Sequence, residues 1–200
     1  MKLSAEFPKD FQECVQFHGH LCPGLAIGYA AVKAGTERLE LGPSPDEEVV
    51  AIVENDSCAV DAVQVLLGCT FGKGNLIFRD WGKQVFTFFG RDSGKAVRVS
   101  FLGPLPGSDE RHALRQKIDA GLATDEDMEA WERLRTDVTK EVISRPATDF
   151  FQVKEIDCDP PPKASVVSTR LCDSCGEPVT EHRIVEHRGS RVCKECASRE

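Results

Sequence analysis

The sequence predicts an α+β fold, in which a mixed core of antiparallel strands and flanking helices is followed by a small cysteine-rich module. Short β-branched runs and longer helical segments occur in mixed order over the first part of the chain. Three consecutive prolines at 160–162 then form a stiff connection to a tail of different composition. The predicted organisation is a core domain over residues 1–156, a proline-rich linker over 157–165 and a small domain over 166–200.

The N-terminal third predicts two helices, a strand and a third helix. Cys22-Pro23-Gly24 opens the second helix, because proline is well tolerated at the first helical position. Small alanines spaced four apart in that helix predict a face that another element can approach closely; they are Ala26, Ala30 and Ala34. The expected spans are a helix ending before the break at 18–20, a helix from 22 to about 39, a buried strand at 49–53 and a helix from 58 to 67.

Three strands, two helices and a last strand are expected next. Asp92-Ser93-Gly94 supplies turn residues between two strands and predicts an antiparallel hairpin. Thr124 precedes three acidic residues, which is typical of a capped helix start. The expected strands are 76–78, 85–89, 96–101 and 150–156, and the expected helices are 108–120 and 124–144.

Composition excludes several classes of function. The formal charge of −8 and the isoelectric point near 5.2 argue against bulk attraction to nucleic-acid phosphates or anionic membranes. No apolar run is long enough for a signal peptide or a membrane span, so a cytoplasmic location is expected. Thiols stay reduced there, and the odd number of nine cysteines rules out complete pairing within the chain. Metal binding or thiol reactivity is therefore the expected use of the cysteines.

Two C-x-x-C pairs in the tail have the spacing of a four-cysteine zinc site. Cys172 and Cys175 form the first pair, and Cys193 and Cys196 form the second. Two residues between ligands allow a tight turn to place both thiolates on one edge of a tetrahedron. The order of a hairpin followed by a short terminal helix predicts a treble-clef or ribbon-like zinc finger. Zn²⁺ would supply the folding energy of so small a unit.

The predicted finger lacks the charge pattern of a nucleic-acid binder. From Val166 onward it contains six Lys or Arg and six Asp or Glu, and it has no aromatic residue. A contact with another protein, or a role in stabilising a dimer, is the favoured interpretation. Neither a nucleic-acid partner nor a membrane partner is expected.

A second group of candidate ligands lies near the N-terminus. His18, His20 and Cys22 fall within five residues at a predicted junction between a loop and a helix. Imidazole and thiolate both suit zinc, nickel or iron. The start of a helix also lowers the pKa of a thiol, which favours the thiolate of Cys22. Cys58 repeats this theme, because it follows a predicted strand and opens a predicted helix.

The remaining cysteines have simpler interpretations. Cys14 lies on the apolar face of the first helix and is expected to be a packing residue, and Cys158 beside the linker is expected to be incidental. Cys69 is left open between the two uses. Gly72-Lys73-Gly74 resembles an anion-binding turn but lacks the full phosphate-loop pattern. Asp61 is a weaker polar candidate for the rim of the core site.

Three segments of the core resemble the FmdE-like family of formylmethanofuran dehydrogenase components. They are 17–24 (FHGHLCPG), 54–61 (ENDSCAVD) and 68–75 (GCTFGKGN). The resemblance covers most of residues 10–155 and implies a homodimeric α+β core with a metal-associated cleft. It makes His20 and Cys58 the first candidates for core metal ligands, followed closely by His18 and Cys22.

The resemblance implies an accessory or maturation role beside molybdenum or tungsten oxidoreductases. The chain lacks the C-x-x-C-x-x-C run of an iron–sulfur protein and is short for housing a pterin cofactor. One alternative is a free-standing enzyme that uses a metal-activated water, or the thiolate of Cys22 or Cys58 with His20 as the neighbouring base. Another is a metal-sensing adaptor whose zinc finger binds a protein partner.

Overall fold

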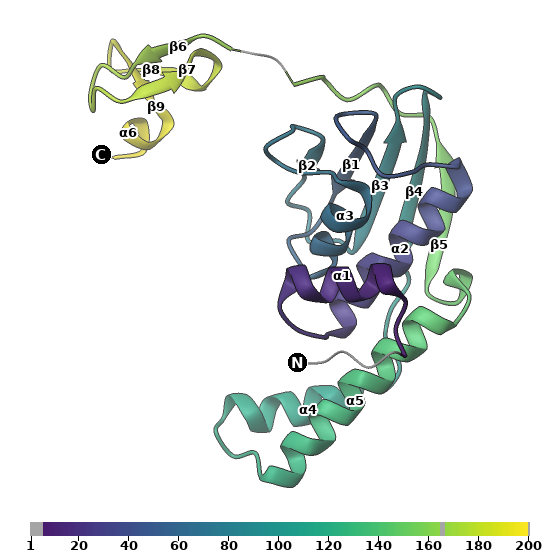
Figure 1. Cartoon of the computed structure of the whole chain (residues 1–200). Helices are drawn as coiled ribbons and strands as arrows, with labels where there is room; N and C mark the ends of the chain where they lie inside the picture. The colour runs from purple at the N-terminus through teal and green to yellow at the C-terminus, as the bar shows by residue number, and fades with distance from the viewer. Residues whose placement is uncertain (1–5, 165–166, 200) are drawn as a thin grey trace. The chain divides into compact units, whose positions relative to one another are not determined.

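The chain folds into two compact units. The computed structural model describes residues 6–164 and 167–199. One unit comprises residues 1–163 and the other residues 164–200 (Figure 1). The boundary between linker and finger that the sequence predicts, at residues 165 and 166, falls outside the described residues.

A five-stranded mixed sheet forms the centre of the first unit, in the strand order β2-β1-β3-β4-β5. β1 and β2 are parallel, and all other neighbouring strands are antiparallel. The α+β class predicted from the sequence is confirmed. The strands are β1 (Val49–Val53), β2 (Leu76–Phe78), β3 (Val85–Gly90), β4 (Lys95–Phe101) and β5 (Phe151–Ile156).

Three helices lie along the sheet and two more form a long hairpin (Figure 1). The three are α1 (Lys9–His18), α2 (Pro23–Leu39) and α3 (Ala59–Leu67). The hairpin consists of α4 (Ser108–Asp119) and α5 (Asp125–Ser144), and a 3₁₀ turn at Ala147–Asp149 leads from it into β5. Thr124 caps α5 in a reciprocal capping box with Asp127, as the acidic helix start predicts.

Two glycines allow α2 to pack unusually closely against its neighbours. A Cβ on Gly28 would lie 2.0 Å from the carbonyl oxygen of Ala59, at the first residue of α3. A Cβ on Gly35 would lie 2.4 Å from the ring of Phe88 in β3. Glycine inside a helix costs about 1 kcal/mol relative to alanine, so each close approach outweighs that cost. The sequence predicts such contacts on an alanine face, whereas these two occur at glycines.

A buried ion pair holds the end of β1. Glu54 is 1% exposed, and the guanidinium of Arg98 in β4 donates to both of its carboxylate oxygens. The side-chain amide of Asn55 donates to the carbonyl oxygen of Lys83 at 3.0 Å. The hydroxyl of Ser57 in turn donates to Asn55 Oδ1 at 2.8 Å. These contacts fix the short connection between β1 and Cys58.

The second unit consists of two small hairpins and a short helix. They are β6 (Thr169–Leu171) with β7 (Pro178–Thr180), β8 (Ile184–His187) with β9 (Ser190–Cys193), and α6 (Lys194–Ser198). A 3₁₀ turn at Glu181–Arg183 joins the two hairpins. The tip of the second hairpin requires left-handed backbone at Arg188 and Gly189.

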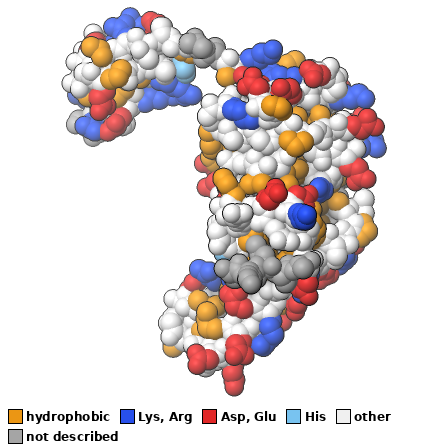
Figure 2. All heavy atoms as spheres, viewed as in Figure 1, with side chains coloured by type: hydrophobic (Ala, Val, Ile, Leu, Met, Phe, Trp, Pro, Cys, Tyr) orange, Lys and Arg blue, Asp and Glu red, His pale blue; other side chains and the backbone are white. Residues whose placement is uncertain are grey.

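Acidic and basic side chains are interspersed over the surface of the core visible in Figure 2. No helix in the described part of the chain combines the length and the apolar composition that a membrane span requires.

Candidate metal centre

The four cysteines of the tail converge on one point. The sulfurs of Cys172, Cys175, Cys193 and Cys196 all lie within 4.8 Å of one another. Gly176 has a φ of +72°, and its N–H donates to the carbonyl oxygen of Cys172 at 2.9 Å, which closes the turn after the first pair. Cys193 ends β9 and caps α6, so the second pair lies at a junction between strand and helix.

Backbone donors prepare this cluster to hold thiolates. The N–H of Cys193 donates to the sulfur of Cys172 at 3.2 Å, and the N–H of Cys196 donates to the sulfur of Cys193 at 3.3 Å. Backbone N–H groups of Cys175 and Cys193 lower the pKa of Cys172 to about 6. Four thiolates in a closed cluster fit a structural zinc ion.

The core candidates converge at the junction between α1 and α2. One ligand atom from each of His18, His20 and Cys22 lies within 4.8 Å of the other two. His18 is the last residue of α1, and Gly19 follows it in left-handed backbone (φ 94°) as the C-cap. Cys22 is the N-cap of α2, where its sulfur accepts the N–H of Leu25 at 3.3 Å. The chain reversal between two helix ends therefore brings the three side chains together.

The geometry at His18 matches that of a metal ligand. Its Nδ1 lies 2.7 Å from Asp61 Oδ2, and its Nε2 lies 3.7 Å from the sulfur of Cys22. Two ligands bound to zinc at ordinary N and S distances, and separated by a tetrahedral angle, lie about 3.6 Å apart. Histidines that bind metals in proteins usually meet a carboxylate, a carbonyl oxygen or a water at their other ring nitrogen, as His18 does here. The residues present therefore fit a transition metal.

Cys58 lies beside this set rather than within it. A Cβ on Gly24 would lie 3.8 Å from the sulfurs of both Cys22 and Cys58, so Gly24 leaves room for the two thiols to face each other. Cys58 precedes α3 as its N-cap residue, with a partly exposed side chain. Its position follows from the close approach of α2 and α3 at Gly28.

The helical hairpin also contacts the loop that carries the ligands. The guanidinium of Arg135 in α5 donates to the carbonyl oxygen of Leu21 and pairs with Glu132 at 2.7 Å. The rings of His18 and His20 lie 4.4 Å apart. Burial, the charge of His18 and the charge of Arg135 lower the pKa of His20, which favours the neutral imidazole that can bind a metal.

The expectation that the helix start lowers the pKa of Cys22 is wrong for the metal-free chain. Cys22 is 9% exposed, and burial raises its pKa to about 11 despite the N–H groups of Leu25 and Gly24. Desolvation of the charged form exceeds the effect of the helix terminus at this depth. A metal that binds here must therefore displace the thiol proton.

The other sequence candidates have structural surroundings. Cys14 is fully buried in the core, and Cys69 is buried with its thiol donating to the carbonyl oxygen of Val49 at 3.5 Å. Lys73 donates to the carbonyl oxygens of Ser44 and Pro45, so it ties two loops together and does not face an anion. Cys158 packs in part against a small apolar cluster on the sheet. Asp61, a weak candidate in the sequence, is the residue that orients His18.

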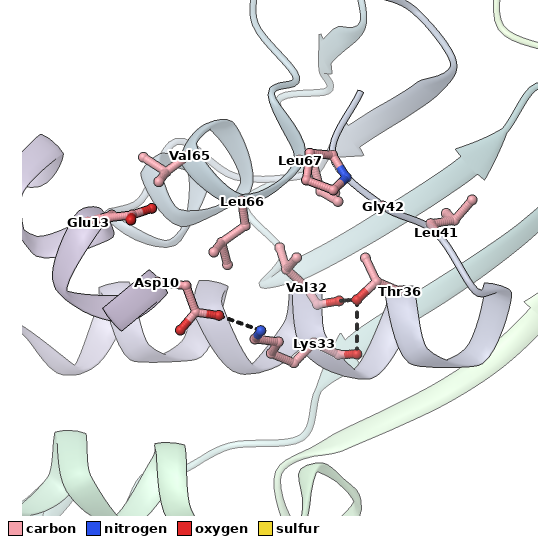
Figure 3. A pocket seen from close by; sticks show the side chains of 11 residues that line it. Asp10, Glu13, Val32, Lys33, Thr36, Leu41, Gly42, Val65, Leu66 and Leu67 are labelled. Carbon is pink, nitrogen blue, oxygen red and sulfur yellow. Dashed lines mark hydrogen bonds and ion pairs between the residues drawn. The ribbon is translucent and has the colours of Figure 1, made fainter. Parts of the chain in front are cut away.

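A separate cavity of about 280 Å³ lies between α1, α2 and the end of α3 (Figure 3). Its walls combine the ion pair of Asp10 and Lys33 with the apolar side chains of Val65 and Leu66. None of the candidate metal ligands lines it.

Comparisons with known proteins agree with this division of the chain. The family model described as "FmdE, Molybdenum formylmethanofuran dehydrogenase operon" matches residues 17–152, and that of the prokaryotic dksA/traR C4-type zinc finger matches residues 168–200. A crystal structure of a tungsten formylmethanofuran dehydrogenase FmdE-like protein from Syntrophus aciditrophicus has a TM-score of 0.61, with 23% identity. That match covers 94% of this chain and 89% of the other.

A curated relative extends the comparison. It is a probable S-adenosyl-L-methionine-binding protein of Archaeoglobus fulgidus, 28% identical over 191 residues. The match covers 91% of this chain and 50% of the relative, so the chain spans about half of that protein's length. The four-cysteine cluster and the matching finger model identify the C-terminal unit as a zinc finger. The match over residues 17–152, which contain the His–Cys cluster and most of the sheet, shows that the chain belongs to the FmdE family.

Proposed function

We propose that the core binds one transition-metal ion through His18, His20 and Cys22, with Cys58 as the fourth ligand or as a group facing it. The single observation that carries this proposal is the tetrahedral separation of His18 Nε2 and Cys22 Sγ, on an imidazole whose other nitrogen meets Asp61. Zinc, nickel and iron all accept this donor set. The side chain of His18 is 11% exposed, so the site is sheltered at one end.

In its biological setting, we propose a cytoplasmic metal-binding accessory or maturation protein for molybdenum or tungsten oxidoreductases. Family membership supports this role, and so does a donor set suited to holding a metal ion. A homodimer is part of the same proposal. Phe17, which directly precedes the cluster, is 60% exposed, and Phe71 is 66% exposed, so apolar surface is available for a second copy. Co-purification with no molybdenum or tungsten enzyme would contradict the assignment.

Asp61→Asn is expected to weaken core metal binding by about 10- to 100-fold. The amide no longer provides a carboxylate to the Nδ1–H of His18, so the imidazole becomes a weaker base and loses its fixed orientation. Competition between the protein and a chromophoric chelator, with the finger zinc in place, measures the change. Asp56→Asn is the matched control, because Asp56 is exposed and lies in the same segment. Equal affinities for all three proteins would contradict the metal assignment.

A second candidate function is binding of S-adenosylmethionine. It is supported by the description of the Archaeoglobus relative and by the cavity in Figure 3, where carboxylates and apolar side chains meet. Carboxylates recognise ribose hydroxyls in other nucleotide sites, and apolar walls suit an adenine ring. Isothermal titration of the full chain with S-adenosylmethionine is expected to give saturable heat that Glu13→Gln reduces. Titration without heat would exclude this candidate.

A further inference from the structure

The hairpin of α4 and α5 contains a second cavity, of about 270 Å³, with cationic and aromatic walls. It is lined by Ser108, Arg111, His112, Arg115 and Trp131. Trp131 is partly buried and comes from α5, whereas the other residues come from α4. The concave shape, one aromatic side chain and several nitrogen donors are features of small-ligand sites.

Arg111 is the cationic residue of this cavity that lacks a partner. Its Nε is buried and has no hydrogen-bond acceptor among the described residues, which also provide no carboxylate within ion-pair distance of its guanidinium. The neighbouring side chains are already engaged: Arg115 pairs with Asp119 at 2.9 Å, and His112 is bonded to Gln116 at 3.0 Å. A buried N–H without an acceptor is costly, so a ligand that supplies one is strongly favoured.

Acidic residues near the cavity do not fill this role. Asp109 and Glu110 occupy the first turn of α4, and Glu110 is exposed. Neither forms an ion pair with Arg111 within the described part of the chain. Their placement at the start of the helix is instead favourable to the helix dipole.

Arg111 also lies within electrostatic range of the core cluster. Burial lowers the pKa of its guanidinium, and the charge of Cys22 opposes that change. The same hairpin contacts the ligand loop directly, through Arg135 and the carbonyl oxygen of Leu21. The hairpin therefore connects the cavity with the residues that carry the candidate metal ligands.

We propose that Arg111 binds the oxyanion of a small-molecule ligand, a carboxylate or phosphoryl group, and that this ligand is the substrate or cargo of the core metal site. Guanidinium groups bind both anions through two parallel N–H donors. The second half of this inference rests on the proposed metal function, whereas the anion site itself does not. The inference assigns a binding role to the α4–α5 hairpin.

Fluorescence of Trp131 tests the anion site directly. The chain contains two tryptophans, so Trp81→Phe in the full-length protein makes Trp131 the sole reporter. The probes are inorganic phosphate and acetate, each titrated at constant ionic strength against chloride. We expect a saturable signal with at least one of the probes, and the tighter of the two identifies the class of oxyanion. A response no different from that of chloride would overturn the proposal.

Variants of the arginine separate binding from general effects of charge. Arg111→Gln is expected to raise the dissociation constant at least tenfold, while Arg111→Lys, which retains the positive charge, restores part of the affinity. Arg133→Gln is the matched control, because Arg133 is exposed and pairs with Glu129, and it is expected to change affinity less than twofold. Unchanged binding in Arg111→Gln would contradict the role of Arg111.

The metal half of the inference is measured in the same samples. Metal content per chain is determined for the parent protein and for His18→Ala, and each is titrated with the tighter oxyanion. Anion binding that weakens when the core metal is lost supports a ligand shared by both sites. Anion binding that is equal in both proteins contradicts sharing but leaves the Arg111 site established. A parent protein without core metal would contradict the proposed function alone.

Discussion

Cys172→Ser is expected to unfold the C-terminal unit while the core remains folded. The apolar core of this unit is very small: its buried residues are Cys172, Val192 and Cys193, and two of these are zinc ligands. The free energy of zinc binding in such fingers, about 10–16 kcal/mol, is therefore the main source of their folding free energy. Loss of one thiolate removes much of it.

Limited trypsin digestion followed by mass spectrometry measures this effect. Cleavage after Arg183, Arg188 and Arg191 is expected to accelerate strongly in the variant, whereas peptides from the core appear at the rate of the parent protein. Cys158→Ser is the control, because it removes a cysteine that lies outside the four-sulfur cluster. A finger equally protected in Cys172→Ser would show that the unit folds without its metal.

Gly28→Ala is expected to lower the free energy of unfolding of the core by about 2–3 kcal/mol. The new methyl group would meet a backbone carbonyl oxygen at 2.0 Å, and backbone cannot move aside by changing a rotamer. The two helices must separate, and overpacking of this kind exceeds the gain of about 1 kcal/mol from placing alanine in a helix. Because α2 begins after Cys22 and α3 begins after Cys58, core metal affinity is expected to fall as well.

Urea denaturation and chelator competition, on the same variant, check both parts of this prediction. Gly42→Ala is the control, because a Cβ at that position meets no heavy atom within 4 Å. Stability equal to or above that of the parent protein would mean that α2 and α3 tolerate a wider separation. Metal affinity that stays constant while stability falls would detach the site from this helix contact.

The order of the core elements could be predicted from the sequence because its local signals agree. The β-branched run at 49–53, the turn residues at 92–94 and the cap at Thr124 each correspond to the observed element. Predicted spans and observed bounds differ by one residue at several ends, such as Lys95 at the start of β4. The pairing of β1 with β2 and β3 depends on long-range contacts that no local signal carries.

The candidate site was predictable only in part, for a similar reason. His18, His20 and Cys22 are close in sequence, so the sequence could group them. Asp61 reaches His18 across 43 residues, and Arg111 acts from a hairpin distant in sequence. Gly28 did carry a signal, since a glycine within a helix requires a reason, but its partner could not be identified. The pKa of Cys22 depends on burial, which local sequence does not reveal.

Metal stoichiometry of the full-length chain tests the central claim most directly. Protein purified without oxygen and analysed by mass spectrometry is expected to carry two metal ions per chain, one of them zinc in the finger. The double variant Cys172→Ser/Cys193→Ser is expected to retain one ion, and His18→Ala/Cys22→Ser is expected to retain only the finger zinc. A parent protein with a single zinc, lost completely with the finger cysteines, would contradict a metal site in the core.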